Sequence, residues 1–274
     1  YQNGEIIFDR RYGSTNTFEK NNYPVGYNLG QSGNTPSQNL VDAYEMIDGT
    51  PFDWNNPEHK SNPYANRDPR LAMSILTNNV EFKDRTIEAW TGGRDGKGVI
   101  HATRTGYYIY KFIDPNLDLL QNRTSVHHWV IMRYAEILLS YAEAMNEAYG
   151  PTGNVGYRLN AVRALNQVRN RVGVEMPAVP TAISKEELRE KIRNERRVEL
   201  AFEDHRFWDV RRWMIAPETL GTPLRGVEIT KISDEEFEYK PIEVEKRTFE
   251  PKMYLYPIPQ ADLNTTGWVQ NPLW

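Results

Sequence analysis

The chain has 274 residues, with 33 Lys and Arg against 37 Asp and Glu, and it contains no cysteine. The net charge of −4 argues against nonspecific nucleic-acid binding, which needs a basic surface. The absence of cysteine excludes disulfides, thiolate zinc sites and cysteine nucleophiles. An apolar fraction of 39% is typical of a folded globular chain, and no apolar run approaches the ~18 residues of a membrane-spanning helix.

Residues 1–126 are predicted to form a loop-rich region with a few short strands. The first 80 residues are dense in Asn and Pro, which favour turns because Asn bonds its own backbone and Pro presets φ. Hydrophobic spacing and β-formers indicate where this region is regular. The expected elements are a helix at Ser37–Ile47 and strands at Glu5–Phe8, Leu71–Leu76 and Tyr107–Phe112.

Residues 127–274 are predicted to be mostly helical. The clearest start signal is a capping box, in which Ser184 precedes Glu187 by three residues and Ile183 and Leu188 fit the hydrophobic staple around it. Short loops between the helices favour helix-hairpin packing of the solenoid type, although no clean 34-residue repeat is present. The helices are expected at His128–Tyr149, Tyr157–Val172, Ser184–Phe202 and Arg206–Met214. The prolines of Tyr254–Pro259 then predict an extended end, tied down by Trp274.

Two carboxylates on the third of these helices invite a catalytic interpretation. Glu195 and Glu199 share the apolar stripe of Leu188 and Ile192, and a pair of this kind is the machinery of a glycoside hydrolase. The same pattern is produced by buried carboxylates that arginines neutralise, and several arginines are close in sequence. We therefore predict a structural ion network and no catalytic residue, with the hydrolase as the alternative.

The segment Arg206–Trp213 is dense in Arg and Trp and has two interpretations. It resembles a surface on which nucleic-acid bases stack. Its spacing also suits packing with cation–π contacts, because Trp208 and Arg212 lie four residues apart, as do Asp209 and Trp213. The acidic balance of the chain favours packing, so no nucleic-acid partner is predicted.

No metal or cofactor is predicted. Asp114, Asn116 and Asp118 have the spacing that opens a calcium loop, but Leu119 and Ser125 stand where Gly and Glu are needed. The five histidines form no zinc-binding pair, and no phosphate-loop or nucleophile-elbow motif occurs.

The loops of the first half carry a surplus of aromatic and amide side chains. Aromatic rings stack on the C–H faces of sugars, and amides hydrogen-bond sugar hydroxyls, so this composition favours a glycan-binding face. The alternative is ordinary anchoring of loops to the core. The candidate ligand-binding residues are Trp54, Tyr23, Tyr27, Tyr12, Asn28, Tyr64 and Trp90.

Several sequence motifs along the chain resemble those of the SusD/RagB family of nutrient-binding lipoproteins. The longest match is Asn194-Glu195-Arg196-Arg197-Val198-Glu199-Leu200-Ala201-Phe202-Glu203, followed by His205-Arg206-Phe207-Trp208-Asp209-Val210-Arg211-Arg212-Trp213. Further matches are Asn66 to Leu71, Thr105 to Tyr108, Arg133 to Leu139, Tyr254 to Pro259 and Gln270 to Pro272. Asp204 departs from the pattern, because Gly is expected there.

This resemblance implies a mostly α fold of tetratricopeptide-like helix pairs beside an irregular ligand-binding region. It implies a noncatalytic protein of the Bacteroidetes outer-membrane surface that binds a glycan ligand, or in some members peptides, for a SusC-type TonB-dependent transporter. Family members are about twice this length, so the chain would match the carboxy-terminal half. The amino-terminal helices and the lipidated cysteine that anchors members to the outer membrane would lie outside it. A peptide-binding scaffold of the same transport complex remains the alternative function.

Overall fold

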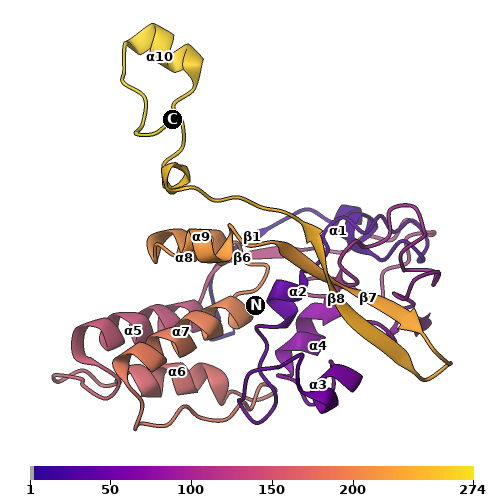
Figure 1. Cartoon of the computed structure of the whole chain (residues 1–274), viewed down its shortest axis with the longest axis horizontal. Helices are drawn as coiled ribbons and strands as arrows, with labels where there is room; N and C mark the ends of the chain where they lie inside the picture. Colours follow the sequence, from indigo (N-terminus) through magenta and orange to yellow (C-terminus); the bar gives the residue numbers. More distant parts are fainter. Residues whose placement is uncertain (1–2) are drawn as a thin grey trace.

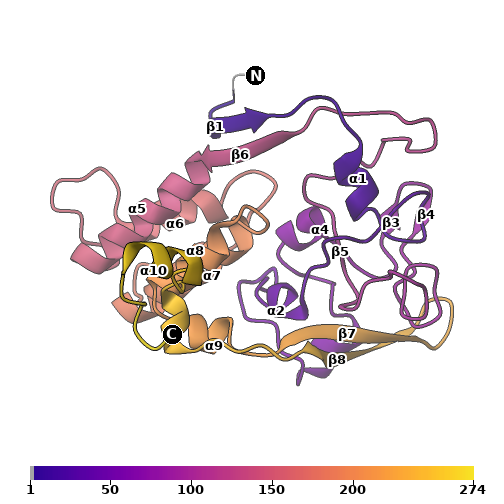
Figure 2. The same ribbon diagram turned by 90° about the horizontal axis from the view of Figure 1, so that it is seen from above.

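The computed structural model describes residues 3–274 (Figure 1). Helices hold 31% of the chain and strands 15%, so the fold is mostly α with short strands, as predicted. A helical layer, from α5 (Tyr134–Tyr149) to α8 (His205–Arg212), stands beside a loop-rich body that carries α1 (Thr17–Asn22) to α4 (Arg70–Ser74) (Figure 2). A strand pair, β1 (Ile6–Arg11) with β6 (His128–Arg133), lies along one edge, and the hairpin of β7 (Leu224–Lys231) and β8 (Phe237–Glu245) lies along the opposite edge.

The strand pair corrects one predicted helix. β1 (Ile6–Arg11) pairs antiparallel with β6 (His128–Arg133), and α5 (Tyr134–Tyr149) begins only after β6 ends. Helix was predicted from His128 onward, whereas residues 128–133 bond to β1. This run contains Trp, Val and Ile, which favour strands, so the long-range pairing and the local propensity agree.

The loop-rich body contains only short elements, and three predictions are corrected there. The helix expected at 37–47 is confined to α2 (Gln38–Val41). The strand expected at 71–76 is mostly α4 (Arg70–Ser74), and only its last two residues form β2 (Ile75–Leu76). The strand expected at 107–112 shrinks to β5 (Tyr108–Ile109), which pairs with β2. The remaining elements are α1 (Thr17–Asn22), α3 (Pro57–Ser61), β3 (Glu81–Phe82) and β4 (Arg85–Thr86).

The helical layer has its own core. α5, α6 (Ala161–Arg169) and α7 (Lys185–Glu199) pack together around Leu139, Leu165 and Leu188. α6 is shorter than the predicted 157–172, because the Asn160 side chain caps it at Arg163 N and the chain leaves the helix after Arg169. The predicted capping box of α7 is present, with Ser184 and Glu187 each bonding the backbone of the other.

The turn after α7 shows why Asp204 is tolerated where the family pattern has glycine. α7 ends at Glu199 rather than at Phe202, and both Phe202 and Asp204 adopt positive φ, of 64° and 63°. Asp204 thus holds a left-handed conformation that glycine adopts without cost and that Asp tolerates better than most residues. The chain then enters α8 (His205–Arg212) and α9 (Ala216–Thr219).

A hairpin absent from the sequence-based predictions closes the loop-rich body. β7 (Leu224–Lys231) and β8 (Phe237–Glu245) pair antiparallel along their whole length. Val227, Ile229 and Tyr239 join the buried cluster of the loop-rich body, alongside Tyr44 and Tyr107. The hairpin comes late in the chain but packs on a core that is built mostly from the first half.

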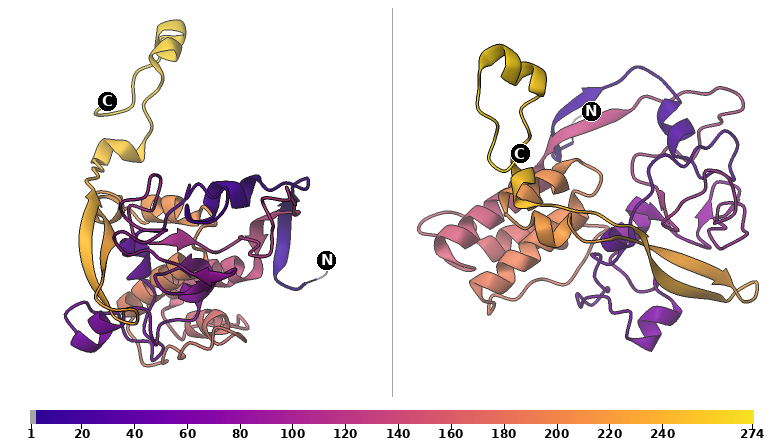
Figure 3. Two further views of the ribbon diagram at one scale, coloured as in Figure 1. Left: turned by 90° about the vertical axis from the view of Figure 1, so that its right-hand side faces the viewer. Right: turned by 45° about the horizontal axis from the view of Figure 1, so that its top comes forward.

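The last residues project away from the body (Figures 1 and 3). They form the 3₁₀ turn η1 (Pro251–Tyr254), an extended stretch through Pro259, and α10 (Gln260–Thr266). The indole of Trp274 donates to the carbonyl oxygens of Lys252 and Leu255, both at 3.0 Å. The prediction that Trp274 ties down the end is confirmed, although it ties the tail to itself rather than to the core.

Candidate functional site

A cleft of about 1070 Å³ opens between the α3–α4 segment and the β7–β8 hairpin. Figure 1 shows α3 and α4 in purple beside the orange hairpin. One wall comprises α3, the turn at 62–69 and α4. The other comprises the hairpin residues 232 and 235–239, and Thr77–Val80 also lines the cleft. The hydrogen-bonded hairpin fixes one wall, and the prolines and Asn-capped short helix of residues 56–69 fix the other.

Five aromatic rings form a continuous row, and three of them, Tyr64, Phe237 and Tyr239, line the cleft. Trp90 packs on Phe237 with ring centroids 5.3 Å apart, and Phe237 is followed by Tyr239 at 6.5 Å. Tyr239 meets Tyr64 edge to face at 5.3 Å, and Tyr64 meets Tyr107 at 6.1 Å. Tyr64 and Phe237 are half-buried and line the cleft, whereas Tyr107 is fully buried. The row therefore presents ring surface to the cleft from a rigid base.

Hydrogen bonds made by the tyrosine hydroxyl groups hold the rings in place. The Tyr64 hydroxyl donates to the Tyr107 hydroxyl at 3.3 Å, and Tyr107 donates to Gln38 Oε1 at 2.5 Å. Asn78 Nδ2 donates to the Tyr239 hydroxyl at 3.4 Å. Burial raises the pKa of the Tyr64 phenol well above its ordinary value and also raises that of Tyr107. Both phenols therefore stay protonated and keep their donor hydrogens at any ordinary pH.

The rim of the cleft is polar and more acidic than basic. Asn62 and Asn79 expose their side chains at the opening. The carboxylates of Glu235, Glu236 and Glu238 come from the hairpin, and Lys60 is the exposed cation opposite them. Amides and a ring face suit uncharged hydroxyl-rich molecules, and the excess of carboxylates disfavours anions in this cleft.

Two of the predicted ligand-binding rings are buried. Tyr23 is 1% exposed, and its hydroxyl donates to the carbonyl oxygen of Asp114 at 2.5 Å. Tyr27 is 7% exposed, and its hydroxyl donates to Phe82 O at 2.8 Å, while the Arg85 guanidinium covers its ring at 3.9 Å. Contrary to the exposed platform predicted, both rings lie in the core and present no face to solvent. These two rings therefore anchor the Asn-rich loops to the core.

The remaining predicted residues are scattered. Trp54 is half-buried against the core, and its Nε1 donates to Asp42 Oδ1 at 3.0 Å. Tyr12 follows β1 on the side of the molecule away from the hairpin (Figure 2), and Asn28 is exposed in the loop after Tyr27. Only Tyr64 and Trp90 belong to the row beside the cleft.

Phe237 and Tyr239 are cleft residues that sequence reasoning missed. The run Phe237-Glu238-Tyr239-Lys240 alternates apolar and charged side chains, which is the pattern of a strand with one buried face. That signal was available in the sequence. Its pairing with Ile229 and the neighbouring residues of β7 places both rings on the same side of the hairpin, toward the core and the cleft.

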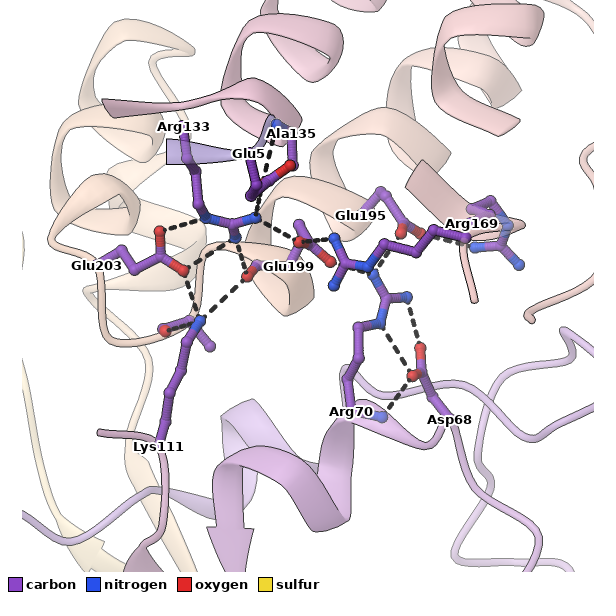
Figure 4. Close-up of polar contacts among 12 residues, drawn as sticks. Glu5, Asp68, Arg70, Lys111, Arg133, Ala135, Arg169, Glu195, Glu199 and Glu203 are labelled. Atoms are coloured by element: carbon purple, nitrogen blue, oxygen red, sulfur yellow. Dashed lines mark hydrogen bonds and ion pairs between the residues drawn. The ribbon is translucent and has the colours of Figure 1, made fainter. Parts of the chain in front are cut away.

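The two carboxylates of α7 lie in an ion network, as predicted (Figure 4). Arg70 Nη1 bonds Glu195 Oε1 at 2.5 Å and Glu199 Oε2 at 2.9 Å. Arg169 bonds the other oxygen of Glu195 at 2.8 Å, and Arg133 bonds the other oxygen of Glu199 at 2.7 Å. Burial acts to raise the pKa of Glu199, but the surrounding arginines outweigh it and lower the pKa to about 2.

The calcium-like spacing does not produce a shared oxygen cluster. Asp114 Oδ1 accepts the Asn116 backbone N–H at 3.0 Å, and Asp118 Oδ1 accepts those of Leu120 and Gln121. These are turn-forming bonds that Asp makes with the residues that follow it. Across residues 3–274, no group of three or more His, Asp or Glu side chains is placed to hold a metal ion.

Comparison with known proteins identifies the fold. The chain aligns over 95% of its length with a SusD-like carbohydrate binding protein of Bacteroides fragilis NCTC 9343 (30% identity, TM-score 0.77), covering 53% of that chain. A second SusD-like protein of B. fragilis NCTC 9343 gives a TM-score of 0.80 at 32% identity, with 98% of this chain and 54% of that one covered.

Sequence relatives agree with the structural neighbours. SusD-like protein P2 of Formosa agariphila is 34% identical over 120 residues, which are 42% of this chain and 22% of that protein. The chain spans about half the length of the two solved relatives. No helix within residues 3–274 is long and apolar enough to cross a membrane. The model of the SusD family matches residues 4–274, and the chain therefore belongs to the SusD family.

Proposed function

We propose that this protein binds glycans at the cell surface without hydrolysing them and delivers them to a SusC-type TonB-dependent transporter in the outer membrane. The observation that carries the proposal is the pair of half-buried rings, Tyr64 and Phe237, beside exposed amides in the cleft. Ring faces stack on sugar C–H surfaces and amides bond sugar hydroxyls. Stacking contributes on the order of 1 kcal/mol per ring, by analogy with other aromatic contacts, so we expect modest affinity.

The similarity to a SusD-like carbohydrate binding protein supports glycan as the ligand class. Membership of the SusD family supports our proposal of a transporter partner, a lipid anchor on a longer protein and an outer-membrane location. We also propose that residues 127–274 act as a tetratricopeptide-like scaffold for the loop-rich region 1–126. The cleft would then draw on both, because Tyr64 comes from the first and Phe237 from the second.

The ion network argues against the hydrolase alternative. A general acid in glycoside hydrolysis needs a raised pKa so that it carries a proton at neutral pH. Glu199 has a pKa of about 2 because arginines surround it, and it is therefore ionised. Both carboxylates are buried and bonded to guanidinium groups on each oxygen. We expect no release of reducing sugar from any polysaccharide.

The test is calorimetry and affinity electrophoresis against a panel of neutral polysaccharides and their oligosaccharides. Tyr64→Ala removes a half-buried ring that lines the cleft, and we expect at least a fivefold loss of affinity for every glycan that the parent binds. Tyr64→Phe keeps the ring and removes the hydroxyl, so it should retain most of the affinity. A thermal melt of each variant separates lost binding from lost folding.

Tyr12→Ala is the matched control, because it removes an exposed ring that does not line the cleft and that directly follows β1, at the edge opposite the β7–β8 hairpin (Figure 2). Its affinity should equal that of the parent. An Asn62→Ala variant extends the test to an exposed amide. Binding that survives Tyr64→Ala and Asn62→Ala in folded protein would place the glycan elsewhere. A parent that binds peptides and no glycan would support the peptide-binding alternative instead.

A further inference from the structure

A second cavity, of about 670 Å³, lies between α2, the turn that joins α7 to α8, and α9. Figure 1 shows α2 beside the end of α7, and Asn194 of α7 bonds the carbonyl oxygen of Ala43 just after α2 at 3.0 Å. Four arginines from separate segments line this cavity, namely Arg197, Arg206, Arg225 and Arg247. Such a convergence of guanidinium groups raises the question of what balances their charge.

Only one of the four arginines is paired with a carboxylate. Arg225 contacts Asp42 Oδ2 at 2.7 Å. Arg197 donates to the backbone carbonyl of Asn39, and Arg247 donates to that of Thr222 at 3.1 Å. Arg206 is half-buried and has no hydrogen bond, ion pair or ring contact with any residue in 3–274.

The neighbouring charges leave the cavity electropositive. Burial and the nearby charge of Arg206 lower the pKa of Arg197 to about 10. Burial also lowers the pKa of Arg206, and the attraction of the nearby Asp209 only partly offsets this effect. Asp204 and Glu218 line the cavity but are exposed, and neither forms an ion pair with any of the four arginines within residues 3–274. An anion bound here would relieve both the burial cost and the repulsion.

The aromatic residues that also line the cavity indicate which class of anion it would bind. Phe207 is 39% exposed at the cavity, and Phe202 is half-buried there. An arginine fork matches a planar carboxylate with two parallel hydrogen bonds, and a ring beside it can contact the face of a sugar. We propose that this cavity binds the carboxylate of a uronic acid in a glycan. The inference builds on the proposed function and adds a second, anion-selective subsite to it.

The test compares matched acidic and neutral ligands by calorimetry on the full chain. Trigalacturonic acid is the probe, and its methyl ester is the uncharged counterpart. We expect the parent to bind the acid at least tenfold more tightly than the ester. Arg206→Gln should remove that preference with little change in the thermal unfolding midpoint, because Arg206 makes no hydrogen bond or ion pair within residues 3–274 and is only weakly attracted to Asp209.

Arg158→Gln removes the same charge from an exposed position in the loop between α5 and α6, and it should keep the preference. Equal binding of acid and ester by the parent, or an unchanged preference in Arg206→Gln, would overturn the inference. So would Arg206-dependent binding of trialanine as tight as that of the sugar acid, which would assign the site to a peptide carboxylate. Failure of the inference is separable from failure of the proposed function, which concerns neutral glycans bound at Tyr64.

Discussion

The two sides of α7 hold arginines in opposite electrostatic settings. On one side, eleven ion pairs connect six cations with six carboxylates. The cations are Arg70, Lys111, Arg133, Arg169, Arg171 and Lys191, and the carboxylates are Glu5, Glu45, Asp68, Glu195, Glu199 and Glu203. Here buried charge is balanced within the chain itself, and the result is a rigid join between the helical layer and the loop-rich body.

On the other side of the same helix, Arg197 and Arg206 both line the second cavity, and within residues 3–274 neither forms an ion pair with a carboxylate. The difference shows how to separate structural charge from functional charge in this fold. A buried cation that already has its anions stabilises the protein and has little capacity for a ligand. A half-buried cation with none is costly in the folded chain, and that cost is lowered when an anion arrives.

The largest predicted effect comes from breaking the balanced side. Arg70 bonds Asp68, Glu195 and Glu199 and is 4% exposed. Arg70→Ala leaves three buried carboxylates short of a partner, so we expect a loss of about 3–5 kcal/mol in the free energy of unfolding. Urea denaturation followed by circular dichroism measures it. Arg206→Gln is the counterpart and should cost less than about 0.5 kcal/mol. Equal losses in the two variants would erase the distinction between the two sides.

A smaller effect is expected from acid. The pKa of Glu199 is about 2 in the folded protein, because Arg133, Arg171 and Arg70 favour its charged form, against an unfolded value of about 4.3. A lowered folded pKa contributes stability that is fully present above about pH 5 and is lost as the pH falls toward 2. The shift corresponds to about 2–3 kcal/mol.

Denaturation series between pH 7 and pH 2.5 give this slope directly. Glu199→Gln should be less stable at pH 7 and should show a flatter decline below pH 5, because the titrating group is gone. Glu245→Gln removes an exposed carboxylate at the end of β8, outside the network, and should follow the parent. A Glu199→Gln curve parallel to that of the parent would mean that other carboxylates dominate the acid response.

Much of the helical layer could be predicted from the sequence, because its signals are local. The Ser184–Glu187 capping box and the apolar stripe through Leu188 and Ile192 place the start and the buried face of α7 correctly. Residues 128–133 were assigned to a helix because they run directly into one. Their pairing with β1, more than 100 residues earlier, decides their conformation, and no local pattern reports that partner.

The candidate site was less predictable, for the same reason. Tyr23 and Tyr64 occupy similar Asn- and Pro-rich contexts, yet one is core and the other faces the cleft. What separates them is the β7–β8 hairpin, which supplies Phe237 and Tyr239 as the opposite wall. The presence of carboxylates among arginines on α7 was enough to predict a neutralised network. Which arginine lacks a partner depends on the packing of α2 against α7 and α8.

A smaller loss of stability than in Arg70→Ala is expected at the start of α7, and it tests whether the helix is stabilised mainly by its N-terminal cap or by the ion network. Ser184 Oγ accepts the Glu187 backbone N–H at 3.1 Å, and a Glu187 oxygen accepts the Ser184 N–H at 2.9 Å. Ser184→Ala removes the first of these bonds and should cost about 1 kcal/mol, with Ser184→Asp restoring most of the loss. Urea denaturation at pH 7 measures both. Because a cap satisfies backbone groups at one helix end only, its loss should be a third or less of the Arg70→Ala loss. If the two losses were equal, the helix start and not the ion network would be the main support of α7.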